Sequence, residues 1–200
     1  QVFIFGAYKK PRELNWISGV ILLMVIAGFG LTGYLLPWDQ KGYWATQVAT
    51  NIMGTIPVIG KYIKSIHLGG SDYGNFTITR FFTLHVFLLP ISLLSFVFIH
   101  LALFRKHGVT PYWKMSQETI HNCVDPFWPD QVFKDIVFAI GMYASLAGWV
   151  FWQGGAELQA PADPASNYLA RPEWYFLFLF QLLKYCQGPF LIVGTVIVPA

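Results

Sequence analysis

Two histidines, His85 and His100, lie within one long apolar stretch of the chain, residues 80–104. A helix that crosses a bilayer needs about 20 apolar residues at about 1.5 Å of rise each, so this stretch is long enough to span. Ionisable side chains at membrane depth are costly and by default mark a functional site facing a bundle interior. The histidines have a spacing of 15 in the sequence, and Pro90 lies between them. That spacing separates them by about 22 Å along the axis and roughly 60° around it, a bearing that a proline kink can adjust.

Two imidazoles close to one helical face, at two membrane depths, suit two cofactors stacked across the membrane. Neutral imidazole is a common axial ligand of haem iron, so haem is the cofactor that this pair predicts. The alternative is a pair of polar histidines that hydrogen-bond to neighbouring helices. His67, His107 and His121 match no ligand position and are interpreted as surface histidines.

The composition is that of an integral membrane protein: 55% of the residues are hydrophobic, 18% are aromatic and only 12% are charged. The net charge of +3 is too small to indicate a nucleic-acid partner, and the sequence has no glycine-rich phosphate loop. Cys123 and Cys186 form no CxxC or CxxCH pattern, so neither a zinc site nor a covalently attached haem is indicated.

The predicted fold is an all-α membrane bundle with three full spans, a truncated fourth span and short interfacial helices in the outer loops. The spans are expected at residues 16–36, 80–104 and 132–152, with the fourth beginning near Pro189. Short helices are expected at 44–53, at 58–67 and after Pro172. The chain starts without Met and closes on a short apolar run, so we interpret it as part of a longer polypeptide.

The first span carries Gly19 and Gly33, whose spacing of 14 is nearly four helical turns, so they share a helix face at two membrane depths. Glycine lets a neighbour approach the backbone closely. The pair therefore suits either close helix packing or contact with a flat macrocycle.

Three stretches together resemble cytochrome b of the cytochrome bc complexes, the quinol-oxidising enzymes of respiration and photosynthesis. They are GYLLPWDQKGYWATQ at 33–47, TRFFTLHVFLLP at 79–90 with FIH ending at His100, and RPEWYFLF at 171–178. The family has eight helices, and this chain is similar to the third to fifth helices and the start of the sixth. The resemblance implies that residues 1–104 end the di-haem N-terminal domain, 105–131 form a cytoplasmic-side linker and 132–200 begin the C-terminal domain.

Features of two family branches occur together in the chain. The histidine spacing of 15 and WDQ at 38–40, where the mitochondrial type has WGQ, resemble the chloroplast type. The fused C-terminal part and the Lys134-Asp135-Ile136 run resemble the mitochondrial type. This mosaic implies a bacterial complex of intermediate type, located as a multi-pass protein in the inner membrane.

By resemblance, His85 ligates the iron of the low-potential haem and His100 that of the high-potential haem. The second axial histidine of each haem belongs to family helices outside this sequence. Gly19 and Gly33 match haem-contact glycines. Arg80 is expected either to pair with a haem propionate or to lie at the interface as a snorkelling arginine.

By resemblance, Glu173 of the PEWY motif accepts a proton from quinol. A carboxylate in a partly apolar pocket suits this role because its proton affinity is raised. The resemblance places Tyr34 beside it in the chemistry, and completes the quinol-oxidising site with Pro172, Trp174, Tyr175 and Trp38. The alternative for these aromatic residues is an interfacial belt. Arg105, Lys134 and Asp135 resemble residues of the quinone-reducing site, or else form a solvated charge cluster.

The resemblance implies bifurcated quinol oxidation, in which one electron passes to a Rieske-type iron–sulfur protein and the other crosses the membrane through both haems to quinone. A c-type cytochrome, the remaining cytochrome b helices, a second copy of the complex and membrane lipid are the other implied partners. Two alternatives stay open: a di-haem anchor of another quinone-linked oxidoreductase, and a haem-free transporter segment.

Overall fold

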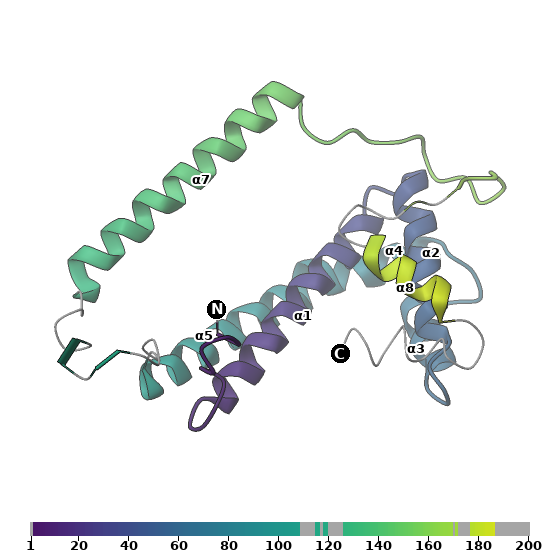
Figure 1. Ribbon diagram of the computed structural model, residues 1–200. Helices are drawn as coiled ribbons and strands as arrows, with labels where there is room; N and C mark the ends of the chain where they lie inside the picture. The colour runs from purple at the N-terminus through teal and green to yellow at the C-terminus, as the bar shows by residue number, and fades with distance from the viewer. Residues whose placement is uncertain are drawn as a thin grey trace. The chain divides into compact units, whose positions relative to one another are not determined.

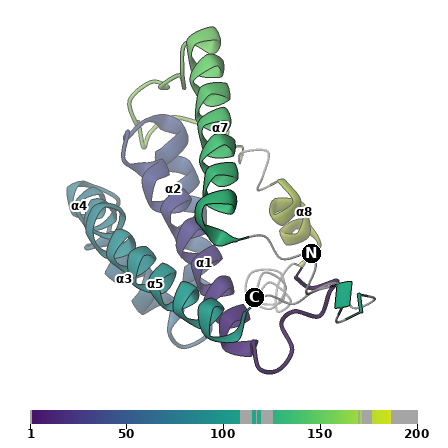
Figure 2. The same cartoon turned by 90° about the vertical axis from the view of Figure 1, so that its left-hand side faces the viewer.

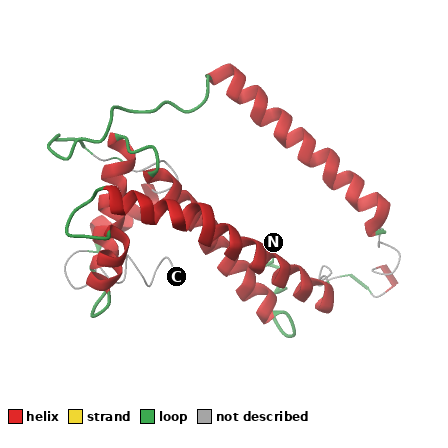
Figure 3. Ribbon diagram, turned by 180° about the vertical axis from the view of Figure 1, so that it is seen from behind, coloured by secondary structure: helices red, strands yellow, loops and turns green. Residues whose placement is uncertain are grey.

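The computed structural model describes residues 2–108, 115–116, 118–119, 126–169, 171 and 177–186. Regular structure in these ranges is helical, and their β pairing is one isolated bridge between Asp39 and Pro161 (Figure 3). Three helical stretches are long and apolar enough to cross a membrane: Glu13–Leu35, Asn75–His107 and Phe127–Gln153. The predicted all-α fold with three full spans is therefore confirmed, whereas the fourth span lies outside the described residues.

The contacts within the chain divide it into two compact units, residues 1–16 with 101–157 and residues 17–100 with 158–200. Helix α1 (Glu13–Leu35) starts slightly before the predicted span and stops before Pro37, which disfavours helical backbone in the residue ahead of it (Figure 1). Its buried residues are mainly polar, Ser18 and Thr32 among them, while large apolar side chains such as Leu23 are exposed. This inverted pattern is typical of a helix surrounded by lipid or other spans.

The histidine helix is continuous from Asn75 to His107 and starts earlier than the predicted Arg80. It consists of α4 (Asn75–Thr83), a π-helical turn η1 (Leu84–Leu88) and α5 (Leu89–His107). The early start has a local cause, because the Thr77 hydroxyl accepts a hydrogen bond from the Gly74 amide and closes the first turn.

The π turn stands where the sequence indicated a kink at Pro90. Leu89 donates its amide hydrogen to the carbonyl of Leu84 instead of that of His85. Proline lacks an amide hydrogen, and its ring clashes with the carbonyl one turn earlier in a regular α-helix. A widened turn directly before the proline relieves that clash, so the helix continues with one extra residue in the turn.

Two short helices connect the first two spans: α2 (Gln40–Gly54) and α3 (Gly60–Leu68). α2 begins before the predicted helix at 44–53 because the Asp39 carboxylate accepts from the Gly42 amide at 2.8 Å and caps it. The best-buried apolar side chains among the described residues come from these two helices, Tyr43 and Leu68, and from the neighbouring ends of the spans, Leu35 and Phe81. The Thr50 hydroxyl bonds to Tyr73, and burial raises the pKa of that phenol.

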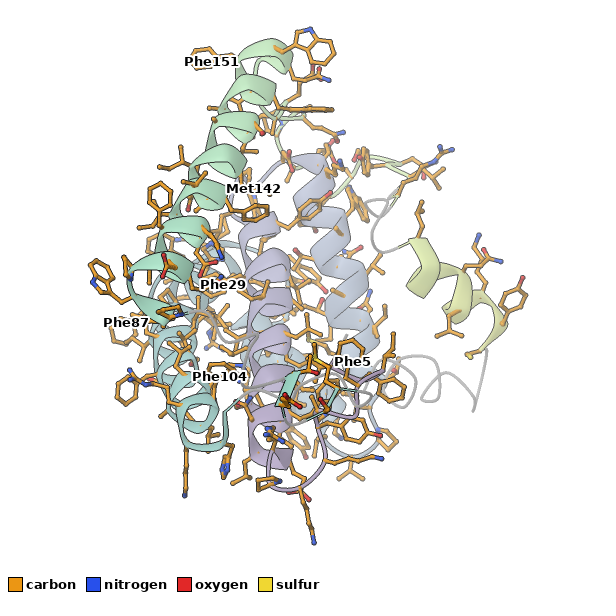
Figure 4. All side chains as sticks on the ribbon, turned by 60° about the vertical axis from the view of Figure 1, so that its left-hand side comes forward. Phe5, Phe29, Phe87, Phe104, Met142 and Phe151 are labelled. Carbon is orange, nitrogen blue, oxygen red and sulfur yellow. The ribbon has the colours of Figure 1, made fainter. Side chains whose placement is uncertain are left out.

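The third span is α7 (Val132–Gln153), preceded by a π-helical turn η2 (Phe127–Gln131). It ends at Gly154, whose φ of 79° is the left-handed conformation that glycine adopts at helix ends. Phe151 and Met142 project from this helix, and the Phe151 side chain is 90% exposed (Figure 4). A further helix, α8, covers Leu177–Tyr185.

Candidate functional site

Both histidines of the second span contact α1 through the same ring atom. The Nδ1 atom of His85 lies 3.0 Å from the Thr32 hydroxyl, and that of His100 lies 2.8 Å from the Ser18 hydroxyl. These pairs require α1 and the histidine helix to run antiparallel, and the two helices lie side by side in Figures 1 and 2. Ser18 and Thr32 are only 4% and 6% exposed, so each imidazole meets a buried hydroxyl.

The hydrogen bond at Thr32 selects one tautomer of His85. Thr32 donates its own hydrogen to the Gly28 carbonyl at 2.7 Å, so its oxygen accepts from the imidazole. The proton of neutral His85 is therefore on Nδ1, and Nε2 keeps a free lone pair. A neutral imidazole held through Nδ1–H is the form that ligates a metal through Nε2.

A glycine directly follows each of these hydroxyl residues. A Cβ atom at Gly33 would lie 2.7 Å from Cε1 of His85, and a Cβ at Gly19 would lie 3.3 Å from Cε1 of His100. Each imidazole therefore lies against bare backbone that an alanine would fill. One imidazole beside such a cradle fits an axial haem ligand, and the described residues contain no cluster of three His, Cys, Asp or Glu side chains that suits a metal ion.

The π turn brings the two pairs into register. The hydroxyl residues of α1 have a spacing of 14, whereas the histidines that they meet have a spacing of 15. Two regular helices would accumulate a mismatch of about 100° and about 1.5 Å over that length. The extra residue of η1 absorbs this mismatch, and both imidazoles face α1.

Residues 1–162 match the family profile described as cytochrome b (N-terminal)/b6/petB. The chain belongs to the cytochrome b/b6 family. Over 110 residues it is 44% identical to cytochrome b6 of Synechococcus elongatus and 46% identical to that of Mastigocladus laminosus, in each case 55% of this chain and 51% of the relative. A chain of a solved hyperthermophilic respiratory Complex III matches with a TM-score of 0.77 at 30% identity, covering 96% of this chain and 52% of that one. This chain therefore spans about half the length of the relatives that it matches.

The family assignment made from the sequence motifs is thus confirmed. Sequence reasoning did not identify the hydroxyl partners Ser18 and Thr32, or Phe29, whose ring meets His85 edge-on with centroids 5.3 Å apart. The sequence did contain a signal, because Ser18 directly precedes Gly19 and Thr32 directly precedes Gly33.

The other predicted cofactor and quinone-site residues lie as follows. Arg80 is exposed on α4 and donates from Nη1 to the Ile66 carbonyl near the end of α3. Arg105 lies in the last turn of α5, and Lys134 lies in the first turn of α7. Asp135 follows it and accepts from the Gln131 amide group at 2.7 Å. Their roles stay predictions.

Two predicted quinol-site residues lie where α1 ends. Tyr34 is half-buried in the last turn, with the Lys41 ammonium 6.0 Å from its ring centroid. Trp38 has a φ of 52° and packs edge-on against Tyr43 with ring centroids 5.4 Å apart. Pro172, Glu173, Trp174 and Tyr175 lie outside the described residues, as does His121. His67, interpreted from sequence as a surface residue, is half-buried and packs against Phe81.

Proposed function

We propose that this chain is part of the cytochrome b subunit of a quinol-oxidising complex, in which electrons cross the membrane through two b haems. The observation that carries the proposal is the repeated pair of imidazoles, each bonded to α1 through Nδ1 beside a glycine. The family match and the similarity to a chain of Complex III support it. On this proposal, residues 1–104 complete the di-haem domain, 105–131 link it, and 132–200 begin the C-terminal domain.

His85 and His100 would each ligate one haem iron through Nε2, and the second protein ligand of each haem would come from helices outside this sequence. Bound haem supplies reversible one-electron transfer. The chain's own residues hold the tautomer of His85 through Thr32, bond the same ring atom of His100 to Ser18, and leave room for each imidazole at a glycine. Arg80 is proposed as a partner for a haem propionate.

Glu173 is proposed to accept the proton of bound quinol, with Tyr34 beside it. Pro172, Trp174, Tyr175 and Trp38 would shape that site, and the position of Tyr34 and Trp38 at the end of α1 supports this. On the other side, Arg105 and Lys134 would attract reduced quinone and Asp135 would deliver protons to it. The proposed partners are a Rieske-type iron–sulfur protein, a c-type cytochrome, the remaining cytochrome b helices and a second copy in a bacterial inner membrane.

Glu173→Gln tests the proposed acid–base role. The amide cannot accept the proton, so we expect quinol oxidation by the complete complex to slow by about 10²–10⁴-fold. Both haems should remain visible in reduced-minus-oxidised spectra. Glu157→Gln, the same change at an exposed position of the loop after α7, is the matched control and should leave turnover unchanged. Wild-type turnover of Glu173→Gln would remove Glu173 from the mechanism, and a purified complex without a b-type spectrum would overturn the whole proposal.

Thr32→Val tests the tautomer argument. Valine keeps a similar shape but cannot accept the hydrogen bond from His85, so the imidazole becomes a weaker donor to ferric iron. We expect the midpoint potential of the haem at His85 to rise, with little change at the other haem. Ser18→Ala should give the mirror result at His100. Potentiometric titration followed by absorbance measures both, and equal shifts of the two haems in either variant would contradict the assignment.

A further inference from the structure

The side chain of Arg12, which directly precedes α1, holds the end of the histidine helix at two points. Its Nε atom donates to the Gly108 carbonyl at 3.1 Å, and its Nη2 atom donates to the His107 carbonyl at 3.1 Å. All three residues belong to the compact unit formed by residues 1–16 with 101–157. We call this two-point contact the Arg12 fork. It joins the start of α1 to the end of α5, which lie side by side in Figures 1 and 2.

The two acceptors of the fork lie where α5 stops. The last four carbonyls of an α-helix have no amide of the same helix to accept from. α5 ends at His107, and Gly108 follows it with a φ of 67°, the left-handed conformation that ends many helices. The Gly108 amide donates to the Phe104 carbonyl at 2.8 Å, and the fork donates to the next two carbonyls beyond the helix's own bonds. The last turn of α5 is therefore held by its own glycine and by Arg12.

The backbone of Arg12 is itself fixed on both sides. Its amide donates to the Lys9 carbonyl at 2.9 Å, and its carbonyl accepts from the Trp16 amide in the first turn of α1 at 3.0 Å. The Tyr8 ring lies between the rings of Phe3 and Trp16, with centroids 5.7 Å and 5.8 Å away. The fork therefore extends from a rigid base, and it fixes the end of α5 relative to the start of α1.

The charges at this helix end indicate that the fork is specific. The last turn of α5 already carries Arg105, Lys106 and His107. A further cation beside side chains of the same sign is disfavoured unless an attraction offsets the repulsion. For Arg12 the attraction comes from the negative end of the helix dipole and from two charge-assisted hydrogen bonds. A planar guanidinium presents several donors in a fixed geometry, whereas the lysine ammonium is a point charge on a flexible stem.

Arg105 lies in the same turn that the fork holds. It precedes the two acceptor residues, His107 and Gly108, by two and three positions. Helix ends fray, and an open last turn would leave Arg105 without a fixed position. When only a fraction of the molecules is competent to bind, the apparent affinity for a ligand falls by that fraction. A closed last turn therefore raises the apparent affinity of any ligand that Arg105 binds.

We propose that Arg12 is a positioning residue for quinone reduction: the fork keeps the last turn of α5 closed and so presents Arg105 to quinone. The proposal rests on the quinone-reducing role proposed above for Arg105. Arg12 acts through the backbone of α5, needs no contact with quinone and carries no proton or electron.

Arg12→Lys in the complete complex removes the fork but keeps the positive charge. The last turn of α5 should then open more often. Hydrogen–deuterium exchange should show the Gly108 amide exchanging about tenfold faster or more, as expected when a hydrogen bond from a charged donor is lost. Lys10→Arg exchanges the same two residue types at an exposed position nearby and is the matched control, which should leave that amide unchanged. Unchanged exchange in Arg12→Lys would overturn the fork itself.

Quinone reduction supplies the second readout. Decylubiquinone is the probe, and stopped-flow absorbance follows the reoxidation of the reduced haem at His100. Arg12→Lys should raise the half-saturating quinone concentration about fivefold to tenfold, because fewer molecules are competent to bind. The limiting rate and both haem spectra should stay unchanged, whereas a merely structural loss would lower the haem content. Faster exchange at Gly108 with wild-type quinone saturation overturns the positioning role.

Two further variants separate positioning from charge. Arg12→Gln removes the charge together with the fork, so wild-type quinone saturation in Arg12→Lys beside weak saturation in Arg12→Gln would show that only the charge matters. In an Arg105→Gln background, Arg12→Lys should add little, because both changes act through one side chain. A full additional loss there also contradicts the proposal. Wild-type saturation of Arg105→Gln alone overturns the proposed role of Arg105 in quinone reduction, but leaves the fork measured by exchange standing.

Discussion

Gly33→Ala is expected to remove most of the haem bound beside His85 while leaving the haem beside His100 in place. The added Cβ would lie 2.7 Å from the imidazole Cε1, closer than side-chain atoms approach. The ring cannot retreat without losing the 3.0 Å hydrogen bond to Thr32. Overpacking of this kind costs about 1–3 kcal/mol, so the affinity for this haem should fall about fivefold to 150-fold.

Alanine substitutions at two other glycines of α1 test whether the loss of haem is specific to Gly33. Gly19→Ala places its Cβ at 3.3 Å from the His100 ring, so a small shift accommodates it and the loss at that haem should be mild. Gly30→Ala meets nothing within 4 Å among the described residues and is the matched control on the same helix. Reduced-minus-oxidised spectra of the purified complexes measure all three. Equal haem loss in Gly33→Ala and Gly30→Ala would mean that helix packing, not the imidazole, requires the glycine.

Deleting Leu88 is expected to preserve both haems, although the deletion lies inside a membrane span. The π turn carries one residue more than a regular turn, so removing it leaves the histidines with a spacing of 14, the same as that of their partners on α1. Deleting Leu94 gives the same spacing of 14 but leaves the π turn in place before Pro90, so it rotates His100 by about 100° relative to His85 and shifts it by about 1.5 Å.

The two deletions therefore give opposite results from the same change in length. Two b-type signals should survive the deletion of Leu88, whereas the deletion of Leu94 should abolish one. Spectra resolved by redox titration distinguish the haems. Loss of one haem in both deletions would show that the π turn does not compensate for the longer spacing.

The spans, the histidine pair and the glycine spacing were predictable from the sequence. A long apolar run nearly always forms a membrane helix. A histidine inside such a run is conspicuous because placing an ionisable side chain in the bilayer costs free energy. The positions where helices start were less predictable. α4 begins at Asn75 because Thr77 closes its first turn, and α2 begins at Gln40 because Asp39 caps it. Both are local hydrogen bonds, which hydropathy does not report.

The hydroxyl partners and the contact of Asp39 with the loop after α7 were not predictable by periodicity. Ser18 and Thr32 look like ordinary small residues until the antiparallel neighbour is known, because their function depends on a helix that lies far along the chain. The contact of Asp39 with Gln159 spans a still longer separation. Hydrophobic patterns specify which faces are buried, but not which polar atoms meet across them.

On the proposed function, the two buried hydroxyl–imidazole bonds would have a mechanical consequence for electron flow. Electron tunnelling slows exponentially as the distance between donor and acceptor increases. A small axial shift of the histidine helix along α1 would therefore make the rate of electron transfer fluctuate. The hydrogen bonds of Thr32 and Ser18 hold the histidine helix against α1 at two positions along its axis. Two such bonds resist both sliding and tilting of the helices, and on the proposed function they would keep the distance between the two haems constant during thermal motion of the bilayer.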